Sequence, residues 1–553
     1  MRRNGEFRYF SGILAEAEWV AHEHDLHIYK FRLRPWLWLL SRRTDCRIFK
    51  NKTPVEIMEA IFSKEAKSAF EDKTTTQLPK IDYCVQYRET DLDFVLRLME
   101  KYGIYYYFRH SETKHTLVLC DSRSGHKMVE AASEPTFKEA GPKFPLLPQS
   151  NTAQRRSEHF GDWSTRRRLR TGRIQLNDYD YKDSDSDLTS RAESGFQNAK
   201  AYERYDYPGA YLTRDQGEHL ARVRVEAEQA RDDRRYASGE APGLFAGALM
   251  RLAEHEILTE NVEYIVVAAS HRLTQQQYRS GDGEDVSVYR SSFELQKSER
   301  QFRAPQRTAR PLALGPHTAK VVGKDNKGEE GDIDVDEFGC ILVRFRWDRE
   351  EKSTSCRIRV AQLWSGKNWG GQIIPRIGQE VIVEFLEGDP DLPLVTGAVV
   401  NNLHMPPYEL PANKTQSGLK SESTDAGGVP RTYNEIMFED LDGREILGLR
   451  AQKDHKIEVL NVETRTIGSR FVDAEFSRKT TLEDGSDKLD ILNGKLDVTA
   501  SREIIMKVGE STFRMLPNSI EITSPTITIK SVAKTEVLSD GTVIVKGGMV
   551  LIN

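Results

Sequence analysis

The chain has 553 residues, of which 38% are hydrophobic and 30% charged, so it is rather polar but long enough for three or four domains of about 150 residues each. A net charge of -5 predicts neither general affinity for nucleic acid nor an acidic tail. Five scattered cysteines without a C-x-x-C pair are too few for a disulfide framework and indicate a reducing compartment. No apolar segment of a secretory signal is visible, and the apolar stretch 35–40 is far shorter than the ~20 residues of a membrane span.

Residues 1–310 alternate strands with helices and predict an α+β region with barrel-like sheets. We expect residues 7–40 to form strands, because apolar and polar side chains alternate there. A helix follows, since Thr53 and Glu56 have the spacing of a capping box.

Two further helices are expected in this region. One begins at Thr90 and ends near Gly103, a plausible C-terminal cap, and the other begins at Thr213. The polar segment 149–190 is expected to be an exposed loop or an inter-lobe segment. Prolines and glycines in residues 301–317 predict a domain boundary.

Residues 318–400 have the size and pattern of a small barrel. Strands are expected at 341–347, 357–360 and 381–385, with glycine-rich turns between them. About five strands in ~80 residues is typical of an OB-fold. Residues 401–432 contain the prolines and glycines of a linker.

The last segment, residues 433–553, is a ladder of short apolar and polar alternations with glycines between them. Such alternation predicts strands that bury one face. Because one chain wound this thinly would lack a core, we expect several chains to wrap into one elongated β-structure. The expected strands lie around Val459, Ile467, Leu489–Ile491, Leu496–Val498, Ile504–Val508, Ile520–Ile522, Ile527–Ile529 and Val543–Val545.

Three groups of residues were weighed as chemical sites. Glu384, Glu387, Asp389 and Asp391 could form a glycosidase carboxylate pair, but a solvated turn after a strand is favoured. His22 and His24, followed by His27, form an H-x-H whose two imidazoles could share a metal on one strand face, but no third ligand of suitable spacing stands out and a surface strand is favoured. Ser365 lacks a nucleophile elbow, and phosphate-binding glycine motifs are absent.

The OB-like barrel leaves a non-enzymatic alternative open, binding of single-stranded nucleic acid. Arginines and aromatic residues alternate there, which places them on opposite strand faces and weakens that alternative. We expect the aromatic face to form the core and the arginines to pair with acidic residues of neighbouring protomers. The residues are Arg344, Arg346, Arg357 and Arg359, with Phe345, Trp347 and Trp364.

Several long motifs resemble VgrG proteins, the valine-glycine-repeat spikes of type VI secretion systems. The longest runs from Cys356 through Gly370 and continues at Ile374–Val381 and Phe385–Asp391. Other matching segments lie in the hub region and before the ladder: Leu33–Leu40, Asp45–Phe49, Glu100–Phe108, Tyr433–Asp440 and Gly443–Glu445.

The resemblance implies a mainly β fold: an α+β hub with β-barrel domains, an OB-fold, and a C-terminal trimeric β-helix or β-prism. It implies a homotrimer that docks on a hexameric Hcp tube and baseplate, carries a PAAR-type cone protein and effectors, and punctures a target membrane mechanically. It implies no catalytic domain, cofactor or metal, and export from the bacterial cytoplasm by the type VI system without a signal peptide. A phage tail spike or baseplate protein is the related alternative.

Two features depart from the family pattern. The family carries a further β-rich segment before the stretch that begins here at Gly5, so we expect an incomplete first hub barrel. The toxin domain of some members is missing after the ladder. We therefore expect the ladder's end to seat the cone protein on an apolar platform formed by Met549, Val550, Leu551, Ile552 and Asn553.

Overall fold

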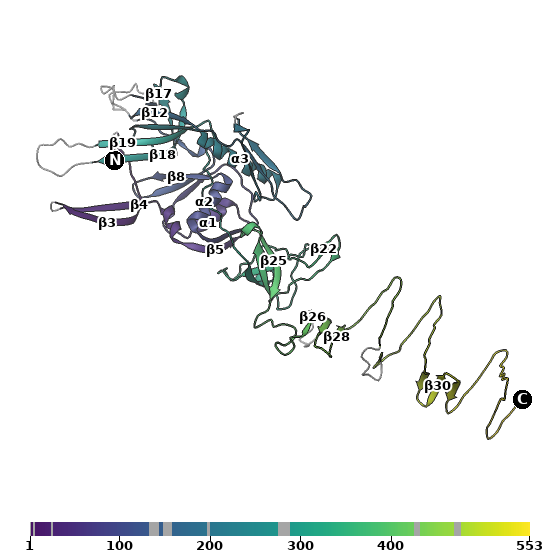
Figure 1. Ribbon diagram of the computed structural model, residues 1–553. Helices are drawn as coiled ribbons and strands as arrows, with labels where there is room; N and C mark the ends of the chain where they lie inside the picture. Colours follow the sequence, from purple (N-terminus) through teal and green to yellow (C-terminus); the bar gives the residue numbers. More distant parts are fainter. Residues whose placement is uncertain are drawn as a thin grey trace, which may run out of the picture. The chain divides into compact units, whose positions relative to one another are not determined.

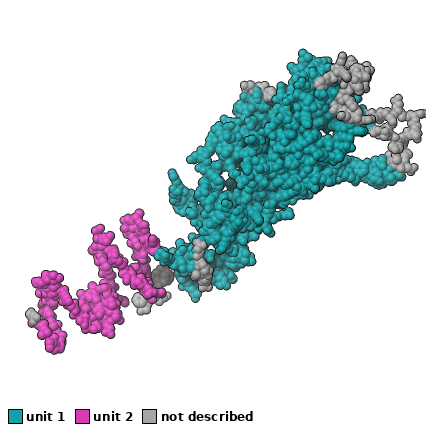
Figure 2. All heavy atoms as spheres, turned by 180° about the vertical axis from the view of Figure 1, so that it is seen from behind, with its two compact units in different colours: residues 1–454 teal, residues 455–553 magenta. Residues whose placement is uncertain are grey.

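The computed structural model has 12% of its residues in helices and 35% in strands (Figure 1). It describes residues 2–3, 6–23, 26–131, 143–147, 158–195, 199–274, 288–424, 432–468 and 477–552. Contacts divide the chain into two units, Met1–Asp454 and His455–Asn553 (Figure 2). Among the described residues, no helix is long and apolar enough to cross a bilayer. The domain boundaries expected from the sequence stay predictions.

Helix α1 (Pro54–Phe62) starts where the sequence predicts. The Thr53 side chain accepts a hydrogen bond from the backbone N–H of Glu56, and the Glu56 side chain accepts one from the backbone N–H of Thr53. This reciprocal pair satisfies two of the amide donors that a helix start leaves open. The predicted capping box is therefore confirmed.

Helices α2 (Asp91–Tyr102) and α3 (Arg214–Asp232) also begin at their predicted caps, Thr90 and Thr213. Helix α2 ends at Gly103, whose φ of 77° lies in the left-handed region that glycine adopts without steric cost.

The apolar stretch after Pro35 is a 3-10 helix, η1 (Trp36–Arg42), and the prediction of a strand up to residue 40 is wrong there. Trp36, Leu37 and Leu40 are buried against α1 and α2. Their spacing matches one helical face, whereas a strand would point Trp36 and Leu37 to opposite sides.

The largest sheet of unit 1 has the strand order β10-β17-β18-β19-β16-β12, with β11 beside β17. Strand β12 lies inside the polar segment predicted as a loop, so that prediction is wrong for residues 159–167. Its outer face is polar, while Phe160 is fully buried in the core under the sheet. The bounds are Lys127–Met128 (β10), Phe144–Pro145 (β11), His159–Arg167 (β12), Asp233–Glu240 (β16), Ala248–Ala253 (β17), Glu263–Thr274 (β18) and Val288–Lys297 (β19).

Smaller sheets complete the hub part of unit 1. Helix α3 packs its apolar face, including Leu220 and Val225, on the sheet β14-β13-β15. The other sheets are the short pair of β1 (Arg2–Arg3) and β2 (Glu6–Phe7), the ribbon β3-β4, the pair β5-β7 and the sheet β6-β9-β8. Their bounds are Ile13–Glu23 (β3), Leu26–Arg34 (β4), Thr44–Phe49 (β5), Phe70–Lys73 (β6), Cys84–Thr90 (β7), Tyr105–His110 (β8), His115–Cys120 (β9), Arg173–Leu176 (β13), Ser190–Glu193 (β14) and Glu203–Asp206 (β15).

A small barrel follows, with the strand order β21-β20-β24-β25. Its core includes the fully buried Val343, Phe345 and Val381. The strand predicted at 357–360 is wrong in detail, because this segment makes single bridges from Ile358 and Val360 to two different strands. The bounds are His317–Val322 (β20), Leu342–Phe345 (β21), Ser365–Gly366 (β22), Trp369–Gly370 (β23), Glu380–Phe385 (β24) and Pro393–Val399 (β25).

Two three-stranded antiparallel meanders come after the barrel. The first is β26 (Gln416–Lys420), β27 (Glu435–Glu439) and β28 (Ile446–Arg450), and β26 lies inside the predicted linker. The second is β29 (Ile504–Val508), β30 (Ser511–Leu516) and β31 (Ser519–Thr523). The remaining ladder residues that the structure describes run without strand pairing in the single chain.

Candidate assembly surfaces

The β29–β31 meander has one mostly apolar face. Met515 lies directly opposite Ile520, and Phe513 lies opposite Ile522. Ile504 and Met506 extend both rows on β29. Ile520 is 65% exposed, so the described residues of the single chain leave this face largely uncovered.

The opposite face of this meander is charged. The Arg514 guanidinium donates to Glu503 at 2.9 Å and lies 3.6 Å from a carboxylate oxygen of Glu521. The sheet is therefore amphipathic, with a face suited to water and a face that needs a partner.

The β26–β28 meander repeats this design. Leu419, Ile436 and Leu449 form one cross-strand row, and Phe438 and Leu447 lie in the next. All five side chains are exposed. A two- or three-stranded sheet is stable in water only when its apolar face packs against something.

The backbone of the remaining ladder also lacks partners. The described parts of residues 455–503 and 524–552 make no backbone hydrogen bond to any other backbone group of the chain. None of the described residues of the second unit is buried. Extended backbone with alternating apolar side chains and open hydrogen-bonding groups is an incomplete sheet, which other chains can complete.

The surface area leads to the same inference. The single chain of 63.2 kDa exposes 39033 Å². A compact monomer of this mass exposes about 20,000 Å². The excess is far larger than a standard protein–protein interface of about 1,600 Å². The chain therefore has the surface of a subunit that is completed by association.

The predicted tip residues lie at the end of this exposed segment. Met549, Val550, Leu551 and Ile552 are all exposed, Ile552 to 90%. Asn553 lies outside the described residues. The assignment of these residues as a docking platform stays a prediction.

The β3–β4 ribbon is a further uncovered surface, and it projects from the part of unit 1 that holds α1 and α2 (Figure 1). One face pairs Trp19 with Tyr29, both exposed. The other face carries ion pairs, including Glu16 with Arg32 at 2.7 Å. The alternation was readable from the sequence, but only the structure shows that neither face is covered.

The histidines weighed as metal ligands lie on this ribbon. The rings of His22 and His27 are 4.7 Å apart, and Trp19 Nε1–H donates to His27 Nδ1 at 3.2 Å. His24 lies outside the described residues. Among the residues that the structure describes, no group of three or more His, Cys, Asp or Glu side chains could hold a metal.

The barrel carboxylates have structural contacts. Asp389 accepts a hydrogen bond from Arg310 and caps its own turn by accepting from the backbone N–H of Asp391 at 3.1 Å. Asp391 accepts from the backbone N–H of Val85 on β7 at 2.7 Å. Burial, followed by the charge of Asp389, raises the pKa of Asp391 to about 6. These contacts join the barrel to the hub within unit 1. Asp389 and Asp391 therefore have the contacts of a structural turn, and these contacts do not indicate a glycosidase carboxylate pair.

Three of the barrel arginines make contacts within the chain, and the expected pairing of these arginines with neighbouring protomers stays a prediction. Arg357 binds Asp334, Arg346 lies 3.2 Å from Glu380, and Arg359 lies over the Tyr181 ring. Phe345 is buried, as expected for the core-facing side of the strand. Arg346, Arg357 and Arg359 are thus engaged within the chain and Phe345 is buried, which weakens the nucleic-acid alternative at these four positions.

Trp364 differs from the buried Phe345, because it is exposed at the hairpin of β22 and β23. Its ring makes an edge contact with Trp369, with centroids 4.8 Å apart. The neighbouring Leu363 and Ile373 are exposed as well. The hairpin is therefore another apolar surface.

The fold and these surfaces define a class: a subunit with a hub, a small barrel, and a thin β-segment that is completed by association. Comparisons agree with each part. Residues 1–277 match the family of the phage tail baseplate hub (GPD), residues 331–399 the type VI secretion system/phage-baseplate injector OB domain, and residues 417–508 the bacteriophage T4 gp5 C-terminal trimerisation domain.

The curated relatives identify the family. The chain is 44% identical to the type VI secretion system spike protein VgrG1b of Pseudomonas aeruginosa over 469 residues, which cover 84% of this chain and 61% of the relative. It is 43% identical to VgrG1a of the same organism, with 84% and 70% covered. A solved Escherichia coli type VI secretion component, c3393, aligns at 18% identity over 71% of this chain and 84% of that chain, with a TM-score of 0.47.

This chain belongs to the VgrG family of type VI secretion system spike proteins. The fold class predicted from the sequence is confirmed. The match spans less than two thirds of the length of VgrG1b.

Proposed function

We propose that three copies of this chain form the spike at the tip of a type VI secretion system. The observation that carries the proposal is the exposure of the apolar faces of the two meanders, together with the unpaired backbone of the described parts of residues 455–503 and 524–552. Around a threefold axis, three such segments bury their apolar faces together and pair their strand edges. The match to a trimerisation domain supports this arrangement.

The proposed role is mechanical. Interleaved strands from three chains leave few free edges, so unfolding one strand means separating it from its neighbours at once. Such a shaft transmits force from the contracting machine to a target membrane. The role needs no catalytic group or cofactor.

The partners follow from the two ends of this arrangement. The hub would dock on the Hcp tube and baseplate, and Met549–Asn553 would seat a PAAR-type cone protein. Effectors and their adaptors would travel on the spike. Assembly would take place in the bacterial cytoplasm, and the system itself would export the protein.

The oligomeric state tests the trimer. Light scattering on the full chain should give about 190 kDa, three times the chain mass of 63.2 kDa. Ile522→Asp places a carboxylate on the apolar face, where burying an unpaired charge costs several kcal/mol in each chain. We expect this variant to dissociate or aggregate.

Glu521→Gln is the matched control, because Glu521 neighbours Ile522 but lies on the charged face. It should remain a trimer. A stable folded wild-type monomer would refute the spike function. A trimeric Ile522→Asp variant would refute the buried face.

Deleting Met549–Asn553 tests the tip. The truncated chain should remain a trimer but lose capture of a purified PAAR-type cone protein. Lys546→Gln, which changes only a charge shortly before this segment, is the control. Unchanged capture by the truncated trimer would contradict the platform and leave the spike function standing.

A further inference from the structure

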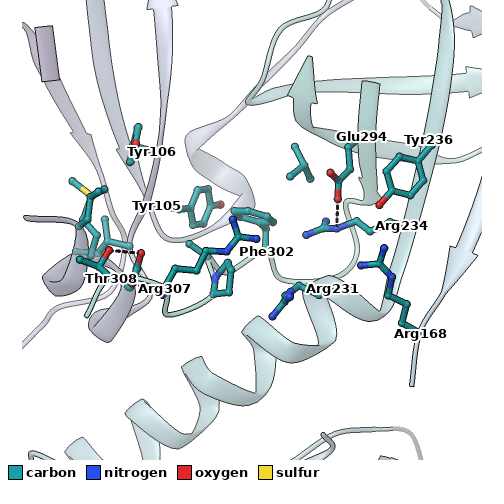
Figure 3. Close-up of a pocket in the computed structure, with 17 residues that line it drawn as sticks. Tyr105, Tyr106, Arg168, Arg231, Arg234, Tyr236, Glu294, Phe302, Arg307 and Thr308 are labelled. Carbon is teal, nitrogen blue, oxygen red and sulfur yellow. Dashed lines mark hydrogen bonds and ion pairs between the residues drawn. The ribbon is translucent and has the colours of Figure 1, made fainter. Parts of the chain in front are cut away.

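A cavity of about 640 Å³ lies in the hub part of unit 1 (Figure 3). Its walls come from α2, β8, the ends of β12 and α3, strands β16, β18 and β19, and the segment 302–308. Cavities of 300–1,000 Å³ are the usual size of sites for small molecules.

The cavity is lined by four arginines and two glutamates. Arg168, Arg231, Arg234 and Arg307 surround it, with the Phe302 ring between them (Figure 3). The lining therefore carries an excess of positive charge.

The two glutamates offset only part of this charge, because four guanidinium groups face two carboxylates and both carboxylates already have partners in the chain. Glu294 pairs with Arg234 at 3.1 Å. Glu100 accepts hydrogen bonds from the backbone N–H groups of Arg307 and Thr308, at 2.8 and 2.9 Å.

The other three guanidinium groups have no such partner. Among the residues that the structure describes, Arg168, Arg231 and Arg307 form no ion pair with a carboxylate. Glu228, which lies one helical turn before Arg231, is paired with Arg170 at 2.7 Å and with Arg204 at 3.2 Å. Unpaired guanidinium groups around a cavity are suited to binding a carboxylate or phosphate oxygen.

The lowered pKa of Arg231 also indicates a site that is suited to an anion. Partial burial and the charges of Arg170, Arg307 and Arg168 lower the pKa of Arg231, although Glu228 opposes the shift. Burial lowers the pKa of Arg234 to about 10. A bound anion would offset this repulsion between like charges.

The floor of the cavity is apolar and aromatic. Phe302 makes an edge contact with Tyr105, with centroids 4.8 Å apart, and Met99 and Ile104 line the same side. Simple inorganic anions would leave this surface uncovered. A ligand with an apolar body would bury it and gain hydrophobic free energy.

We propose that this cavity binds an organic anion with an aromatic or aliphatic body. Its acidic group lies between Arg231 and Arg307, and its body packs on Phe302. The concave shape favours a small molecule over an acidic segment of a protein partner. The site depends on unit 1 alone and is independent of the spike function.

Isothermal titration calorimetry on the full chain tests the proposal with two probes, 2-naphthoate and inorganic phosphate. We expect 2-naphthoate to bind at least about tenfold more tightly than phosphate, because only the former covers the floor. Arg231→Gln and Arg307→Gln should each weaken binding of 2-naphthoate about tenfold, the effect of losing one charge-assisted hydrogen bond.

Arg251→Gln is the matched control, since Arg251 is exposed on β17 and does not line the cavity. It should bind as the wild type does. Arg307 is itself exposed, so its variant keeps the test informative should Arg231→Gln fail to fold. Binding of neither probe, equal binding of both, or unchanged binding by both cavity variants would overturn the proposal.

Discussion

Replacing Asp391 with asparagine is expected to stabilise unit 1 above pH 6 and to have little effect near pH 4. Asp391 lies at the junction of barrel and hub, where it accepts a hydrogen bond from the backbone N–H of Val85. Asparagine keeps an acceptor oxygen of the same shape at this position, so the hydrogen bond can persist while the charge is removed.

The direction of the expected stability change follows from the raised pKa of Asp391. Burial and the nearby charge of Asp389 raise the pKa of Asp391 to about 6 from its ordinary value of 3.8, against the opposing charge of Arg97. The folded state thus disfavours the carboxylate. This penalty is fully present above pH 6 and disappears as the pH falls through 6 toward 4.

Two pKa units correspond to about 3 kcal/mol. Because the side chain keeps some contact with solvent, which reduces the penalty, we expect Asp391→Asn to stabilise by about 1–2 kcal/mol at pH 7.5. The melting temperature of the hub transition should rise by about 2–5 °C.

Differential scanning fluorimetry between pH 4 and 8 measures the effect as the difference between variant and wild type. Wild type is subtracted from the variant because buried neutral histidines also make the stability depend on pH, and they lower it as the pH falls. Burial lowers the pKa of His271 to about 4, so its contribution is present above 6.5 and is lost as the pH falls toward 4. A variant that is destabilised at pH 7.5, or whose difference from wild type is independent of pH, would refute the reasoning.

Two further substitutions in the hub have defined outcomes. Glu260→Gln should lower the stability of unit 1 by about 3 kcal/mol, because it breaks a buried two-point contact with Arg235, whose Nη2–H donates to Glu260 Oε1 at 2.8 Å. Gly103→Ala should cost about 1–3 kcal/mol, since φ is 77° there and a Cβ would lie 2.9 Å from a methyl group of Val223. Thermal unfolding at pH 7.5 measures both.

Each has a matched control. Glu16→Gln removes an exposed ion pair with Arg32 and should change the stability by less than about 1 kcal/mol. Gly315→Ala meets a similar φ of 82° but open space, so it should cost less than Gly103→Ala. Equal effects of Glu260→Gln and Glu16→Gln would contradict the role of burial. Equal effects at the two glycines would contradict the contact with Val223.

Local sequence signals predicted the helices well. The side chains of Thr53, Thr90 and Thr213 each accept a hydrogen bond from the amide three residues later, so the few residues around them carry the whole signal. The segment after Pro35 was misjudged, since a short apolar run does not by itself distinguish a buried helix from a strand. Only its packing on α1 and α2 decided between them.

Long-range contacts were beyond the sequence. Strand β12 is polar on its exposed face and looks like a loop until its pairing with β16 is known. Arg346 and Arg357 were expected to pair with other protomers, and the fold brings Glu380 and Asp334 of the same chain beside them. The anion cavity could not be predicted at all, because its arginines are separated by up to 139 positions and meet only after folding.

The sequence by itself determined which helices form, which side chains of the ladder share a face, and to which family the chain belongs. These properties rest on neighbouring residues or on long motifs, both of which can be read along the chain. The tertiary structure decided which charges are paired, which cavity the hub encloses, and that residues 455–552 have no core of their own where they are described. The alternation of apolar and polar residues predicts that a strand has an apolar face, but only the arrangement in space shows whether the same chain covers that face.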